Sequence, residues 1–138
     1  MRRRFGLVGV MALMAAALMV PATASAGSAY GYKVTQNYCS GDHPNITVKL
    51  IKPAGYYADR FQIVAQGQHK NLGGGSWYNE GNNNSFSRDV PGGTAKYTWT
   101  KGITWNPPDG QWHRIKLRLK VIDNGSVVAA STIYSVRC

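Results

Sequence analysis

The clearest chemical pattern in the sequence is a row of cations on alternate positions near its carboxyl end. Arginine or lysine alternates with an apolar residue from position 114 to 121, and this period of two predicts a half-buried β-strand. The cations would lie on one side, about 6.6 Å apart, as a linear strip of positive charge that suits a polyanion. No carboxylate between Asp109 and Asp123 neutralises the strip. The predicted polyanion-binding residues are Arg114, Lys116, Arg118 and Lys120, with Lys49 and Lys52 added if their strand shares the sheet. An ordinary solvated sheet face is the alternative interpretation.

A second group of candidate residues is aromatic. Trp77 and Tyr78 lie within residues 67–84, GQHKNLGGGSWYNEGNNN, which show no strand pattern and predict a long loop. Aromatic rings stack on the apolar faces of sugars and amides hydrogen-bond to hydroxyl groups, so this loop is predicted to bind a polysaccharide. The alternative is that Trp77 folds back as a lid on the core. Trp105 and Trp112, which flank a proline-rich turn, are a second candidate stacking pair.

The sequence gives little support for catalysis. Most of the six carboxylates lie beside glycine, asparagine or proline, as is typical of turns. His43, His69 and His113 have no metal-ligand spacing among themselves, and neither a nucleophile elbow nor a phosphate-binding loop is present. We therefore expect no metal, no cofactor and no enzymatic activity. A small hydrolase would require two of these histidines, or one of them with Asp59, in a single cleft.

The amino-terminal segment indicates the compartment. Three arginines, an apolar run over positions 5–20 and Ala24-Ser25-Ala26 predict a secretory signal peptide over residues 1–26, exported by the general or the twin-arginine route. Its alanine-rich, arginine-headed composition is typical of bacteria. Cleavage would leave 112 residues with 13 Lys and Arg against 6 Asp and Glu, a net charge of +7. No later segment is apolar enough to span a membrane, so we expect a secreted, extracellular chain.

Two cysteines remain after the signal peptide, and an oxidising compartment favours one disulfide between Cys39 and Cys138. Two free thiols, or a bond between chains, are the alternatives. Cys138 would lie on the apolar face of its strand together with Tyr134 and Val136. The bridge would therefore be buried and would hold the last strand in place.

The cation row is expected to lie in a β-hairpin. Asn124-Gly125 is a strong signal for a two-residue turn, because both central residues of a type I′ turn need a positive φ. A regular hairpin would pair Val121 with Val128 and Leu117 with Thr132. Further strands are predicted over residues 27–37, 45–52 and 60–66, with weaker candidates at 85–90 and 94–101 and a bulge proposed at Lys101-Gly102.

These elements predict an all-β fold, an antiparallel β-sandwich of about seven strands that is immunoglobulin-like and fills residues 27–138 as a single domain. The Cys and Trp signature of true immunoglobulin domains is absent. The predicted function is a secreted, monomeric, non-catalytic protein that binds a polysaccharide or an anionic cell-surface polymer. A secreted protein inhibitor or cationic antimicrobial factor, which would act on a protein partner or an envelope, is one alternative. A small hydrolase is another.

Overall fold

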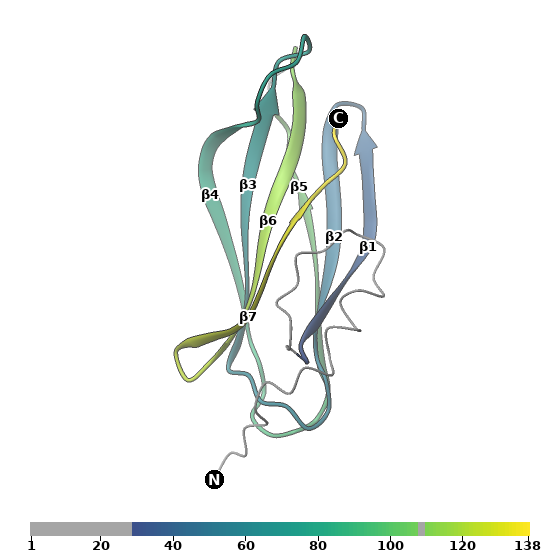
Figure 1. The fold of residues 1–138 in the computed structure, drawn as a ribbon. Helices are drawn as coiled ribbons and strands as arrows, with labels where there is room; N and C mark the ends of the chain where they lie inside the picture. Colours follow the sequence, from purple (N-terminus) through teal and green to yellow (C-terminus); the bar gives the residue numbers. More distant parts are fainter. Residues whose placement is uncertain (1–28, 108–109) are drawn as a thin grey trace.

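The computed structural model describes residues 29–107 and 110–138. The predicted signal peptide and part of the proline-rich turn lie outside these residues. The described chain contains no helix and forms seven strands in two antiparallel sheets, one of order β1-β2-β5 and one of order β4-β3-β6-β7 (Figure 1). The strands are β1 (Gly31–Ser40), β2 (His43–Lys52), β3 (Arg60–Lys70), β4 (Tyr78–Asp89), β5 (Tyr97–Thr104), β6 (Trp112–Asp123) and β7 (Ser126–Tyr134).

The two sheets lie face to face in a sandwich-like arrangement and share one apolar core, which confirms the predicted all-β class. In the middle of β2, β3 and β6 every second residue is apolar, and these residues point between the sheets. The alternating apolar residues therefore form the core, and burial of this one face fixes the register of each strand. The most deeply buried apolar side chains are Ile46, Val48, Leu50, Phe61, Ile63, Ile115, Leu117 and Ile133.

The turn between β6 and β7 confirms the hairpin prediction, whereas the predicted pairing beyond it is wrong. Asn124 and Gly125 both have positive φ, 49° and 74°. The register then shifts between Val121 and Ile122, so that Val121 pairs with Ala129 and Val128 becomes the extra residue of a β-bulge. All later pairs are therefore shifted by one residue along β7. As a result, Ile133 lies opposite Leu117 and its side chain is buried in the core.

Residues 67–84 were expected to form a loop, and this expectation is wrong. β3 continues to Lys70 and β4 begins at Tyr78, so most of the segment is a long β-hairpin with a short connection. The proposed bulge at Lys101-Gly102 is also wrong, since β2 and β5 pair without a register shift. Gly102 lies opposite Thr47, and a Cβ at this position would be 3.3 Å from the Thr47 Oγ1 atom.

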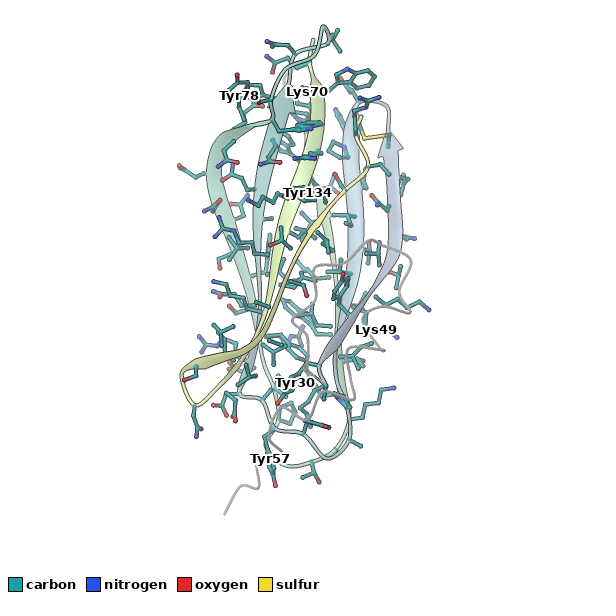
Figure 2. All side chains as sticks on the ribbon, in the orientation of Figure 1. Tyr30, Lys49, Tyr57, Lys70, Tyr78 and Tyr134 are labelled. Carbon is teal, nitrogen blue, oxygen red and sulfur yellow. A yellow bond between two sulfur atoms is a disulfide. The ribbon has the colours of Figure 1, made fainter. Side chains whose placement is uncertain are left out.

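The predicted disulfide is confirmed. Cys39, near the end of β1, bonds to Cys138 with a Cα–Cα distance of 5.6 Å (Figure 2). The bond connects one sheet to the segment that follows β7 of the other sheet, and the backbone N–H of Val136 also donates to Asn37 Oδ1 at 2.7 Å. The predicted burial of the bridge is wrong, because Cys39 is exposed. Tyr134 and Val136 are exposed as well, because the β7 bulge reverses the predicted faces.

Candidate functional site

The cation row lies on the outer face of the four-stranded sheet. Ile115, Leu117 and Leu119 of β6 are buried in the core, and the residues between them face away from it. Glutamines of the neighbouring strand β3 accompany the cations: Gln62 pairs with Lys120, Gln66 with Lys116 and Gln68 with Arg114. We call this surface the outer face, defined by Gln62, Gln66 and Gln68 of β3 and Arg114, Lys116, Arg118 and Lys120 of β6.

The outer face is electropositive because no carboxylate of its four strands lies beside the cation row. Strands β3, β4, β6 and β7, all of which the structure describes in full, contain three carboxylates. Asp123 is buried, and Glu80 is the cross-strand neighbour of Gly67, which faces inward. Asp89, at the end of β4, lies 3.4 Å from the Nε atom of Arg60. In the described chain, no ion pair joins Lys116, Arg118 or Lys120 to a carboxylate. These three cations therefore retain their charge for an external anion.

Arg114 differs from the other three cations because aromatic rings flank it on both sides. Its guanidinium carbon lies 4.2 Å from the ring centroid of Trp77 and 4.1 Å from that of Tyr134. Its Nε donates to Gln68 Oε1 at 2.8 Å. Loss of hydration lowers the pKa of the Arg114 guanidinium from its ordinary value, an effect that the nearby Tyr134 opposes. Arg114 is thus a structural bridge as well as a positive charge.

More aromatic and cationic side chains extend this arrangement. Lys70 pairs with Trp112 across β3 and β6, and its Nζ lies 5.9 Å from the Trp77 ring. The Arg137 guanidinium carbon lies 4.4 Å from the Trp112 ring. We call these side chains the aromatic–cation cluster: Lys70, Trp77, Trp112, Arg114, Tyr134 and Arg137. Trp77 contacts these cations of the outer face, so the interpretation of Trp77 as a lid on the core is wrong.

The other two predicted stacking residues lie apart from this cluster. Tyr78 stacks on His69 with a centroid distance of 5.6 Å, and Trp105 meets His113 edge-on at 5.3 Å. His69 and His113 are direct cross-strand partners on the inward side of β3 and β6. The four predicted aromatic residues are therefore divided, with Trp77 and Trp112 on the outer face and Tyr78 and Trp105 on the inner side.

Lys49 and Lys52 do not widen the cation row, and this expectation is wrong. Their strand β2 belongs to the other sheet, on which Figure 2 shows Lys49. The Lys52 side chain is only 1% exposed, and its Nζ donates to the carbonyls of Tyr56 at 2.8 Å, Gly93 at 3.4 Å and Ala95. Burial lowers the pKa of Lys52 from its ordinary value. Lys52 therefore stabilises the fold and is not accessible to a polymer.

His69 and His113 lie together as cross-strand partners, whereas His43 belongs to the other sheet. His43 pairs with Asp42 at 3.4 Å and His69 with Glu80 at 3.2 Å. His113 is fully buried and is therefore inaccessible to a substrate. Across residues 29–107 and 110–138, no group of three or more His, Cys, Asp or Glu side chains could hold a metal ion.

Four residues of the outer face and the aromatic–cation cluster were not predicted from the sequence: Gln62, Gln66, Gln68 and Tyr134. Gln62, Gln66 and Gln68 alternate with the core residues of β3, so the same period of two that revealed the cations could have identified them. Tyr134 could not be placed in this way, because the bulge in β7 reverses its face.

Models of known protein families give no match to this sequence, and no curated protein is significantly similar to it. In the part of the chain that the structure describes, no helix is long and apolar enough to cross a membrane.

Proposed function

We propose that this protein is a secreted, non-catalytic binding protein whose ligand is an anionic polysaccharide. The observation that carries the proposal is the continuity of the outer face: Lys116, Arg118 and Lys120, none of them ion-paired in the described chain, run directly into the aromatic–cation cluster. Cations attract acidic groups, and aromatic rings pack against the apolar faces of sugars. One linear polymer of acidic sugars would use both kinds of group.

The secreted location rests on the predicted signal peptide and agrees with the disulfide, which persists in oxidising compartments. We further propose an immunoglobulin-like topology. The strand order supports it, because strands 1, 2 and 5 form one sheet while strands 3, 4, 6 and 7 form the other, as in sandwiches with Greek-key connections.

The proposal is tested by measuring binding to alginate, a linear polyuronate, over a range of salt concentrations. The triple variant Lys116→Gln/Arg118→Gln/Lys120→Gln should bind at least about tenfold more weakly. The plot of log K against log salt concentration should also become less steep, by up to about three units of slope. The reason is that a variant with three fewer cations displaces fewer counterions from the polymer.

The matched control removes three charges from other surfaces. Lys33→Gln/Lys49→Gln/Lys96→Gln changes the net charge by the same amount, and none of its residues lies on the outer face. Affinity in this control should stay within about threefold of the parent. Equal weakening by both triple variants would mean that net charge alone drives binding, and the proposed site would be rejected.

A further inference from the structure

A pocket of about 300 Å³ opens between the edges of the two sheets, away from the outer face. β4 is the edge strand of one sheet and β5 is an edge strand of the other. Apolar side chains of Ala65, Ile103 and Ile115 line its buried part. The volume is at the lower end of the range for small-molecule sites, which suits one ring-sized group.

Trp105 forms one wall of the pocket, and Gly67 fixes its position. A Cβ built on Gly67 would lie 2.6 to 2.8 Å from three atoms of the Trp105 ring. The indole can therefore lie directly against the β3 backbone only because residue 67 has no side chain. Its edge-on contact with His113 restrains it further, and the ring remains half-buried beside the pocket.

The opposite wall is a bulge of β4 that carries asparagine side chains. The β3–β4 register passes from Ala65 opposite Asn84 to Gly67 opposite Glu80, so residues 81–83 have no regular partners. The buried side chain of Gln66 holds this bulge, because its Nε2 donates to the carbonyls of Glu80 at 2.9 Å and Gly81 at 3.3 Å.

The bulge has a pocket side and a solvent side. Asn82 and Asn84 line the pocket, whereas Asn83 between them does not. The wall is held in place by hydrogen bonds before any ligand arrives, so little ordering of the chain would oppose binding.

The charge of the pocket is opposite to that of the outer face. Among the residues that the structure describes, Glu80 is its one charged lining residue, and no lysine or arginine lines it. The Glu80 carboxylate lies 3.2 Å from His69 Nδ1. An acidic sugar would meet this carboxylate without a lysine or arginine to compensate it, whereas a neutral ring meets an apolar floor, an indole and two amides.

We propose that this pocket binds an uncharged pyranose unit, packed against Trp105 and hydrogen-bonded by Asn82 and Asn84. The site is independent of the anionic-polymer site proposed for the outer face. A protein with both sites would bind acidic and neutral sugars on separate surfaces.

The test is calorimetric titration of the purified protein with neutral tetrasaccharides of β-1,4-glucose, β-1,3-glucose and β-1,4-mannose. At least one should bind saturably, with an affinity that does not change with salt. Asn82→Ala/Asn84→Ala should weaken that binding by about tenfold or more, since two hydrogen bonds are lost. Both side chains are exposed in the free protein, so the variant should keep the parent's thermal unfolding midpoint.

Two control variants show whether the sugar binds in this pocket or at another surface. Asn83→Ala removes the same amide from the same bulge, and it should leave the affinity unchanged. Lys116→Gln/Arg118→Gln/Lys120→Gln should also leave it unchanged, even if alginate binding is lost. Absence of binding by all three sugars at millimolar concentration would overturn the proposal, as would equal weakening by Asn83→Ala or loss of binding in the cation triple.

Discussion

The Arg114 guanidinium carbon lies 4.2 Å from the centroid of the Trp77 ring, which joins the cation row of β6 to the connection between β3 and β4. Such a contact is attractive because the ring face carries a negative quadrupole. Tyr134 provides a second ring at 4.1 Å, so the guanidinium lies between two aromatic groups from different parts of the chain. One side chain thereby fixes the position of the Trp77 connection on the sheet.

Replacing this cation should destabilise the fold and release Trp77. Arg114→Met keeps an apolar stem but loses two cation–π contacts and the hydrogen bond to Gln68, so we expect a loss of about 1–2 kcal/mol in the free energy of unfolding. Urea denaturation measures the loss, and tryptophan fluorescence should shift to the red as the indole gains water. Arg118→Met, on the same face and without a ring contact among the described residues, should stay within about 0.5 kcal/mol of the parent. Equal effects of the two changes would contradict the bridging role.

Gly67 should not tolerate even one added carbon. Gly67→Ala would place a Cβ 2.6 Å from the Trp105 ring, so the indole or the β3 backbone must move, at a cost of about 1–3 kcal/mol. Thermal unfolding measures this cost. Gly73→Ala is the control, because an added Cβ there has no neighbour within 4 Å, and its unfolding midpoint should match that of the parent.

Two lysines of β2 should differ sharply in their importance for stability. Lys52→Met removes the charged donor of three hydrogen bonds, to the carbonyls of Tyr56, Gly93 and Ala95, and we expect a loss of about 2–3 kcal/mol. Lys49→Met, on the solvent side of the same strand, should change the stability by less than about 0.5 kcal/mol. Chemical denaturation of both variants under the same conditions checks the contrast, and similar losses would refute it.

Tyr32 should make the protein less stable in alkaline solution. Its hydroxyl is buried without a hydrogen-bond partner in the described chain, and loss of hydration raises the pKa of this phenol above its ordinary value of about 10. Above pH 10 the phenol ionises in the unfolded chain before it does so in the folded protein, so its contribution to stability is lost as pH rises.

Tyr32→Phe removes this titration and a buried hydroxyl. The variant should be as stable as the parent at pH 7, or up to about 1 kcal/mol more stable, and its stability should decline less between pH 10 and 11. Denaturation at a series of pH values compares the two slopes. A parallel decline of parent and variant would show that Tyr32 does not contribute.

The disulfide should supply a large share of the stability. It joins residues 99 positions apart, and closing a loop of this length restricts the unfolded chain by about 4–5 kcal/mol in the chain-entropy model. Cys39→Ser/Cys138→Ser should lose about this amount in urea denaturation, and the reduced parent should behave in the same way. A double variant as stable as the oxidised parent would show that the bond constrains little.

Strict alternation made β6 and its turn predictable. Each apolar residue from Ile115 to Val121 had a cation beside it, and the folded sheet keeps this division. β4 was harder to recognise, because glycine and asparagine have low strand propensity and its bulge interrupts any alternation. The glycine- and asparagine-rich sequence therefore suggested a loop where the structure has a strand.

Lys52 was predicted to bind a polyanion because it is a lysine, although its position in the strand indicates that it faces the core. Lys49 and Lys52 are three residues apart, so they must face opposite sides of a strand, and Lys52 shares the side of Leu50 in the core. Its partners come from loops after β2 and before β5, and no local pattern could bring them together. The same limit applies to Tyr134, whose exposure depends on a single inserted residue in β7.

The bulge of β4 also bears on how separate molecules behave toward each other. β4 is an edge strand of twelve residues without proline, and such an edge offers backbone donors and acceptors to any other extended chain. Residues 81–83 interrupt that row, so a strand from a second molecule would meet a break in register near the middle of β4. The feature that shapes the pocket thus also works against edge-to-edge polymerisation.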